Sequence, residues 1–252
     1  MKNIFLYANG CSRTWGGELF HSLFDKNDNL LDCYNPSPIN KARLQVTWPG
    51  ILSKKLGGDG TTASFINNAM GCGSNERILR TTTNFFLKNK PDNPLAIIQF
   101  TDPIRGEYYD EDLEKWYPWK DNCLVLPRKL KNKHGKLYKC IEEYMVLVKY
   151  SKQYYVLYQQ MLALHNFFKS NNIPYIFMSI YFDRIIIEVE KMCKKEKLPM
   201  DIFNFIKEPH GTIKLDKEYV FPSNHPNEKG HIKIADILYN EIQLLAKYWQ
   251  YH

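Results

Sequence analysis

Two histidines near the end of the chain are placed where they could take part in chemistry. The segment 221–231 reads FPSNHPNEKGH and holds His225 and His231 just ahead of an apolar-periodic stretch. A histidine can act as a general base or as a metal ligand. No third metal ligand is evident nearby, so we predict no metal site. His225 is the candidate base, and His231 fits a structural residue that holds its loop by a hydrogen bond.

A general base acts on a nucleophile, and the amino-terminal segment supplies a candidate. The apolar run NIFLYA (3–8) is followed by NGCS, which places Ser12 on a turn. A serine hydroxyl becomes an effective nucleophile when a base within hydrogen-bonding distance takes its proton. Taken alone, Ser12 would more often be a helix cap. Cys11 offers a cysteine–histidine pair instead, although we favour Cys11 as a small apolar residue turned into the core.

The elements that would position these residues alternate between strands and helices. Four runs that are apolar along their length predict strands covered on both faces, and amphipathic patterns between them predict helices. This alternation predicts an α/β fold, a three-layer α/β/α sandwich around a central parallel sheet of about five strands. The predicted strands are 3–8, 63–69, 94–100 and 173–182, and the predicted helices are 48–57, 74–89, 140–172 and a last one from about 226.

Polar residues follow each predicted strand. In an open parallel sheet, ligands bind outside the carboxyl ends of the strands, so these residues should meet at one edge. They are Gly10, Cys11, Ser12 and Arg13 after the first strand, Asn68, Gly71, Cys72, Gly73, Ser74 and Asn75 after the second, Thr101, Asp102 and Arg105 after the third, and Asp183 and Arg184 after the fourth.

Three segments of the chain resemble motif blocks of the SGNH (GDSL-type) hydrolases. GCSRTWG (10–16) is similar to the first block, Gly-Asp-Ser, with Cys11 in place of Asp. NNAMGCGSN (67–75) resembles the second block, and PSNHPNEKGH (222–231) resembles the fifth, Asp-x-x-His. The resemblance implies a flavodoxin-like sheet and acyl transfer, mostly the hydrolysis of esters and removal of acetyl groups from sugars. It implies Ser12 as nucleophile, His225 as general base and the Gly73 N–H as an oxyanion-hole donor.

The third block departs from the family pattern. Thr101 stands where the family has an Asn whose side chain completes the oxyanion hole, in the segment IIQFTDP. A threonine hydroxyl can donate one hydrogen bond. We therefore expect an oxyanion hole formed by the backbone N–H groups of Ser12 and Gly73 together with the Thr101 hydroxyl.

The fifth block departs as well, because Pro222 stands where the family has the Asp that orients the histidine. Another acceptor must then hold the second ring nitrogen of His225. The candidates are Ser223, Asn224 and Asp183, with Asp102 or a backbone carbonyl as further choices, and the sequence does not choose among them.

Residues 103–139 interrupt the alternation with a charged and aromatic segment, which we interpret as an insertion or lid. Trp116 and Trp119 could stack on a sugar or contact a protein partner, or they could fill a small core under the loop. Arg105 could bind a substrate carboxylate or phosphate, or it could pair with Asp102 or Glu107.

Composition limits the classes of protein. The chain has 252 residues, 44% of them hydrophobic, and we expect one domain over 1–252. No apolar run is long enough to span a membrane and no export signal is evident, so we expect free cysteines, no membrane partner and a cytoplasmic location. The net charge of +7 comes mostly from lysine, and several of the lysines cluster at 127–139 and 190–198. We interpret these as solvated faces and expect no nucleic-acid partner.

Two functions follow from these observations. The first is a serine hydrolase that cleaves a carboxylic ester, such as an O-acyl or O-acetyl group on a carbohydrate, without a metal or organic cofactor. The second is a catalytically degenerate binding or structural module of a larger assembly, for example a viral one or a virion, that uses the 103–139 insertion to contact a protein partner. Only the enzyme requires Ser12 and His225 within hydrogen-bonding distance, with an acceptor behind His225.

Overall fold

The structure is a computed structural model of the whole chain. It describes residues 4–19, 38–57, 63–112, 114–120, 123–124, 136, 139–140, 143, 150–180 and 183–249. The structural statements below concern these residues. Most of the lysine-rich segment 127–139 lies outside them, as does much of the first part of the helix predicted over 140–172.

The centre of the fold is a parallel sheet of five strands, as predicted. Its order is β2-β1-β3-β7-β8, and every neighbouring pair is parallel. Four strands fall on the predicted apolar runs, whereas β8 pairs over only two residues and was not predicted. The strands are β1 (Phe5–Asn9), β2 (Ser64–Asn67), β3 (Pro94–Gln99), β7 (Tyr175–Ile180) and β8 (Thr212–Ile213).

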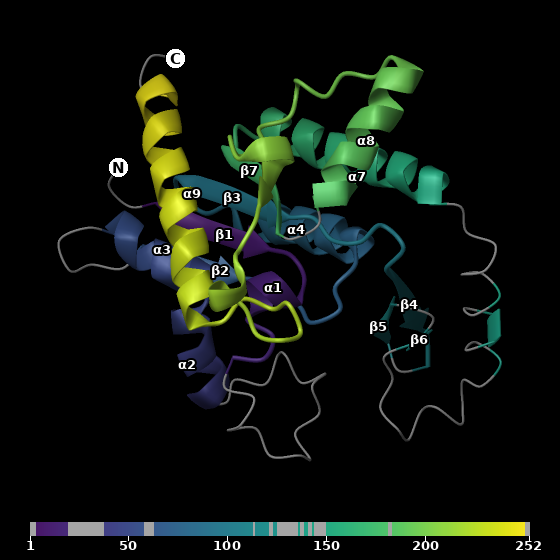
Figure 1. Cartoon of the computed structure of the whole chain (residues 1–252), viewed down its shortest axis with the longest axis horizontal. Helices are drawn as coiled ribbons and strands as arrows, with labels where there is room; N and C mark the ends of the chain where they lie inside the picture. Colours follow the sequence, from purple (N-terminus) through teal and green to yellow (C-terminus); the bar gives the residue numbers. More distant parts are fainter. Residues whose placement is uncertain are drawn as a thin grey trace.

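Helices cover both faces of this sheet (Figure 1). On one face, α3 (Trp48–Gly57) and α9 (Glu228–Trp249) pack against alternate strand residues such as Leu6, Ile97 and Met178. The opposite face is covered by α4 (Asn75–Asn89), α7 (Tyr150–Ser170) and α8 (Asp183–Glu196). Successive side chains of a strand point to opposite faces, so each central strand contributes to both cores. This confirms the predicted three-layer α/β/α sandwich.

A second, smaller sheet follows β3. It consists of the antiparallel strands β4 (Gly106–Asp110), β5 (Lys115–Lys120) and β6 (Cys123–Leu124) and lies to one side of the main sheet (Figure 1). Arg80 of α4 joins it to the main body: its guanidinium contacts the Glu107 carboxylate at 2.7 Å and stacks over the Trp116 ring at 4.2 Å. The part of the 103–139 insertion that the structure describes is therefore largely a folded sheet.

Two further short helices lie between β1 and α3 in the described part of the chain. The one-turn helix α1 (Ser12–Trp15) follows β1 directly, and α2 (Pro38–Val46) leads into α3. No helix in the described part of the chain combines the length and the apolar character needed to cross a membrane.

Candidate active site

The turn between β1 and α1 places Ser12 at the carboxyl edge of the sheet. Gly10 packs so tightly that an added Cβ would lie 2.7 Å from the Thr14 hydroxyl and 2.9 Å from the Gln99 side-chain oxygen. The Asn9 side chain accepts the Gly10 N–H at 2.9 Å, which closes the turn. Ser12 is the first residue of α1, so its N–H has no acceptor within the helix and remains available.

A second turn places His225 just before α9. The Phe221 N–H donates to the His225 carbonyl at 2.8 Å, and the Asn224 N–H donates to the Phe221 carbonyl at 2.9 Å. Asn224 adopts a left-handed conformation, with φ of 64°, and its side chain is exposed. An added Cβ on Gly230 would lie 2.1 Å from the Tyr219 carbonyl oxygen, so the first turn of α9 rests directly on the preceding segment. The two hydrogen bonds of the turn and the packing of Gly230 together hold His225 in place.

Ser12 and His225 meet although 213 positions separate them in sequence. The distance from His225 Nε2 to Ser12 Oγ is 2.9 Å. The other ring nitrogen, Nδ1, lies 3.3 Å from Glu18 Oε1 and 3.2 Å from Ser223 Oγ. A carboxylate can only accept a hydrogen bond, so Glu18 favours the tautomer with the proton on Nδ1. Nε2 then carries the lone pair that can accept the Ser12 proton.

Glu18 is the functional residue that the sequence prediction missed. It reaches His225 because the chain reverses after α1: Gly16 has φ of 87° and Glu18 itself has φ of 73°. Gly17 lies between the two reactive side chains, where an added Cβ would be 3.1 Å from Ser12 Cβ and 3.2 Å from His225 Cδ2. The signal available in the sequence was the Gly-Gly pair directly after the Ser12 helix, followed by a carboxylate.

The three predicted candidates for orienting His225 have different positions. Ser223 contacts Nδ1, as noted above. Asn224 shapes the turn through its backbone. Asp183 is the first residue of α8, and its side chain lies outside what the structure describes. Asp102 accepts the Ile104 N–H on Oδ1 at 3.1 Å. The carboxylate found in contact with His225 is therefore that of Glu18, which was not among the candidates.

The predicted oxyanion donors also differ in their surroundings. The Gly73 N–H donates to the Met70 carbonyl at 3.0 Å, in a turn where Cys72 has φ of 61°. This N–H is therefore engaged within its own turn. The Thr101 hydroxyl is completely buried and has no hydrogen-bond partner. The Asn75 side chain fixes the backbone of Thr101: it accepts the Thr101 N–H and donates to the Thr101 carbonyl, each at 2.9 Å.

Cys11 is fully buried beneath the site. Its thiol lies 3.4 Å from the Gln99 Nε2, which donates to it, on the side of the chain that faces the sheet. Burial raises the pKa of this thiol, but the charges of Arg105 and Arg13, together with hydrogen bonds from the Arg13 N–H and Gln99, lower it to about 7. The ring of His225 is bonded to Ser12, so the geometry favours serine over cysteine as the nucleophile.

His231 joins two helices in the core. Its Nδ1 accepts the Trp48 N–H at 3.1 Å, which ties the start of α3 to the first turn of α9. Complete burial, and then the nearby His225, lower the pKa of His231 to about 3. The ring is therefore neutral near neutral pH. No group of three or more His, Cys, Asp or Glu side chains in the described part of the chain could hold a metal ion.

Acidification is expected to destabilise the fold through His231. Between pH 6.5 and 3 the unfolded chain binds a proton that the folded chain excludes, so stability is greatest above about pH 6.5 and falls as the pH drops. This contribution amounts to about 2 kcal/mol between pH 7.5 and pH 5. Urea unfolding at both pH values would measure it. His231→Asn, whose side-chain oxygen can accept the Trp48 N–H, should lose about 2 kcal/mol less over the same interval, and an equal loss in both proteins would contradict this role.

The predicted substrate-binding residues lie on or next to the small sheet. Trp116 is 41% exposed and contacts the Tyr109 ring at a centroid distance of 5.0 Å. Trp119 covers Gly106, where an added Cβ would lie 2.2 Å from the indole ring. Trp119 therefore helps to build the small sheet, whereas Trp116 and Tyr109 present aromatic surface to solvent. Arg105 lies on the connection between β3 and β4.

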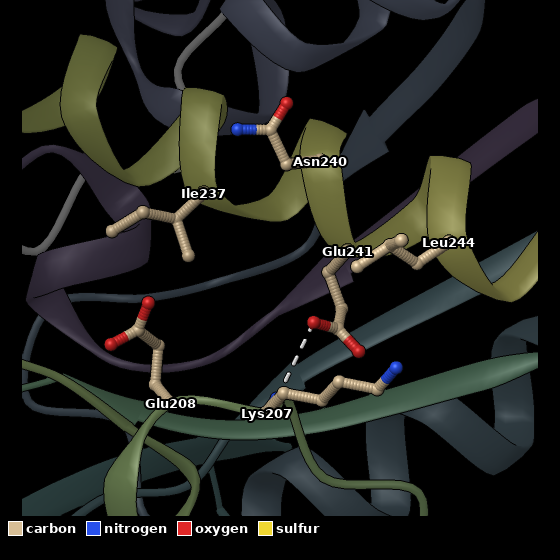
Figure 2. A pocket seen from close by; sticks show the side chains of 6 residues that line it. All are labelled: Lys207, Glu208, Ile237, Asn240, Glu241 and Leu244. Carbon is tan, nitrogen blue, oxygen red and sulfur yellow. Dashed lines mark hydrogen bonds between the residues drawn. The ribbon is translucent and has the colours of Figure 1, made fainter.

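A pocket of about 280 Å³ lies elsewhere on the molecule, between α9 and the residues after β7 (Figure 2). The Glu241 side chain points into the space there, and its Oε2 accepts the Lys207 N–H at 3.4 Å. Glu241 is 13 residues past the first residue of α9, or about 20 Å along the helix from the His225 end. The lining residues are Lys207, Glu208, Ile237, Asn240, Glu241 and Leu244, none of which belongs to the Ser12–His225–Glu18 arrangement.

A family model matches most of the chain. The model, described as a family of unknown function (DUF6071), covers residues 28–194, which is more than half of the length. The chain belongs to the DUF6071 family. The matched range ends before His225 and begins after Ser12, so membership does not by itself bear on this pair. A search of curated protein sequences finds no match to this DUF6071 chain.

Solved structures with the same architecture show which fold this DUF6071 member has. The structure titled TesA has 12% sequence identity and a TM-score of 0.51, covering 96% of this chain and 99% of its own. The psychrotrophic esterase EstA from Pseudoalteromonas sp., inhibited by monoethylphosphonate, has 11% identity, a TM-score of 0.46 and coverage of 98% and 100%. A putative lipolytic protein of the G-D-S-L family from Desulfitobacterium hafniense has 11% identity, a TM-score of 0.45 and coverage of 95% and 99%. The likeness to TesA shows the fold, the three-layer α/β/α sandwich that the sequence predicted.

Proposed function

We propose that this DUF6071 protein is a serine hydrolase that cleaves carboxylic esters. The observation that carries the proposal is the contact of 2.9 Å between His225 Nε2 and Ser12 Oγ, with the Glu18 carboxylate behind the ring at 3.3 Å. Acyl transfer requires a nucleophile, a base in contact with it, and an acceptor that orients the base. The three residues come from two turns that are far apart in sequence, so no local turn or capping requirement explains their meeting.

The geometry supports the following reaction. Ser12 Oγ attacks the acyl carbonyl carbon while His225 Nε2 takes the hydroxyl proton, and Glu18 stabilises the imidazolium that forms. The Ser12 N–H and the Thr101 hydroxyl, which have no acceptor of their own, are the donors for the oxyanion of the tetrahedral intermediate. His225 then gives its proton to the leaving alcohol oxygen, and a water molecule activated by the same ring hydrolyses the acyl-enzyme to release the acid and restore Ser12.

A carbohydrate ester, such as an O-acetylated sugar, is the substrate class that we favour. Its support is the pair of exposed aromatic rings, Tyr109 and Trp116, on the small sheet that begins a few residues after Thr101. Aromatic faces of this kind stack on sugar rings and also serve at protein interfaces. The proposed reaction requires neither metal nor organic cofactor.

A catalytically degenerate module is the second candidate. Two observations favour it: the third-block Asn is replaced by Thr101, and the Gly73 N–H is engaged by the Met70 carbonyl. In that case the small sheet would be the contact surface for a protein partner. A module of this kind requires no reactivity at Ser12.

Hydrolysis of p-nitrophenyl acetate and butyrate separates the two candidates. The enzyme is expected to release p-nitrophenol with saturation in substrate, at a rate above that of the matched Ser12→Ala variant. Equal rates for the two proteins, both folded by circular dichroism, would sink the hydrolase proposal and favour the binding module.

A further inference from the structure

The guanidinium of Arg105 has buried donors without acceptors. Its Nε and Nη1 atoms are shielded from solvent and have no hydrogen-bond partner. An arginine side chain stays charged and carries five N–H donors, so it cannot relieve this situation by losing a proton. Buried donors are normally paired, because leaving one unpaired destabilises the fold. An acceptor from outside the chain, such as an oxyanion on a substrate, would pair this edge.

Nearby carboxylates of the same loop are engaged elsewhere. The Glu107 carboxylate accepts two hydrogen bonds from Arg80, at 2.7 and 2.9 Å. Asp102 Oδ1 accepts the Ile104 N–H, and the Asp102 carbonyl accepts the Arg105 N–H at 3.2 Å. The sequence had left open a pairing of Arg105 with Asp102 or Glu107. The contacts show the loop backbone held in place while the Arg105 Nε and Nη1 donors remain unpaired.

Arg105 lies close to the reactive residues. It follows Thr101, the proposed oxyanion donor, by four residues, and its positive charge acts on the buried Cys11 thiol, which directly precedes Ser12. Arg13, the residue after Ser12, brings a second positive charge to the same place and is 8% exposed. Two cations beside one nucleophile create a positive potential that attracts anionic substrates and repels cationic ones.

We propose that Arg105 binds an oxyanion on the substrate, so that this enzyme prefers esters bearing a carboxylate or a phosphate over neutral esters. The proposal rests on the proposed ester hydrolase and narrows its substrate to an anionic ester, such as an acylated sugar that bears a carboxylate or a phosphate. Arginine suits this role because its planar donors match the geometry of carboxylate and phosphate oxygens. The charged group can belong to the acyl part or to the alcohol part of the ester, and two matched substrates distinguish these sources.

The kinetic test compares three esters: p-nitrophenyl acetate, p-nitrophenyl monosuccinate with a carboxylate on the acyl part, and 1-O-acetylglycerol 3-phosphate with a phosphate on the alcohol part. Arg105→Met keeps the apolar stem and removes the charge. It should lower kcat/KM for one of the two anionic esters at least tenfold more than it lowers kcat/KM for the acetate ester. Lys195→Gln removes one positive charge from a side chain that is 83% exposed, and it should not change kcat/KM for any of the three esters. An equal loss for neutral and anionic esters, or no loss, would overturn the proposal.

A binding measurement keeps this inference separate from the proposed function. Inorganic phosphate and succinate, compared with chloride at equal ionic strength, should raise the Tm of the native protein and not that of Arg105→Met. In the absence of these anions, Arg105→Met should unfold at the same or a higher temperature, because the substitution removes unpaired buried donors. A protein that hydrolyses no ester but shows this anion effect would refute the hydrolase and retain the anion site. A Tm that responds to neither anion would refute the anion site.

Discussion

Ser12→Ala is expected to abolish ester hydrolysis, lowering kcat/KM by about 10⁴-fold or more. The substitution removes the hydroxyl that contacts His225 Nε2 at 2.9 Å, and so removes the covalent route. The fold should be unaffected, because the N-cap of α1 is Cys11 and the Ser12 hydroxyl contacts His225 rather than the backbone of α1. Initial rates on the best ester, with the Tm of each protein as a check on folding, would measure the effect.

The same loss should follow from His225→Ala, and the two losses should not add. Nucleophile and base act as a unit, so removing the second after the first should change little further. The double variant is therefore expected to match either single variant within a few-fold. A double variant whose loss equals the product of the two single losses would mean that Ser12 and His225 act independently, against the proposed mechanism.

Glu18→Gln is expected to lower kcat by about 10²-fold with little change in KM. The neutral amide removes the charge that stabilises the imidazolium, and its NH₂ group can hold the wrong tautomer of His225. The loss should be smaller than for a fully buried aspartate, because the Glu18 side chain is 30% exposed and Ser223 also contacts Nδ1. Steady-state kinetics at saturating substrate would give kcat directly.

Ser223→Ala is the matched control for this prediction. It removes the other side chain that contacts Nδ1, at 3.2 Å, without changing the charge. We expect a loss of about tenfold or less, since a neutral hydroxyl stabilises an imidazolium less than a carboxylate does. A larger loss in Ser223→Ala than in Glu18→Gln would make Ser223 the orienting residue and reduce Glu18 to a surface contact.

The main strands could be predicted because each is apolar along its whole length. β1, β3 and β7 are covered on both faces, so their sequences carry no polar side and stand out from the helices. β8 could not be predicted in the same way, because it pairs over two residues only and depends on β7 for its position.

The helix α8 could not be predicted for a different reason. From the sequence, we interpret the lysines of 190–198 as a solvated face. In the structure, most of this segment lies on the exposed side of α8. The buried side of that helix is carried by Ile185, Ile186, Val189 and Cys193, at spacings of one, three and four residues. Charged residues dominated the local composition and obscured this apolar stripe. The small sheet from β4 to β6 was interpreted as part of an insertion because its aromatic and charged residues alternate over short, irregular runs.

Two of the three site residues could be predicted from the sequence and one could not. Ser12 and His225 could be proposed because strand ends converge at one edge of a parallel sheet and because their segments resemble family motifs. Glu18 could not, since its contact with His225 depends on a left-handed backbone at Gly16 and Glu18 and on the packing of Gly17 against both reactive side chains. Through-space contacts of this kind leave no regular spacing in the sequence.

Covalent labelling of Ser12 tests the central proposal most directly. The purified protein would be treated with a fluorophosphonate between pH 6 and 9, and labelling would be read by intact mass and by peptide mapping, beside Ser12→Ala and His225→Ala. A serine hydrolase should gain one phosphonyl group on the peptide that contains Ser12, and neither variant should be labelled. A folded native protein that remains unlabelled over this range, or is labelled equally in His225→Ala, would contradict a Ser12 nucleophile activated by His225.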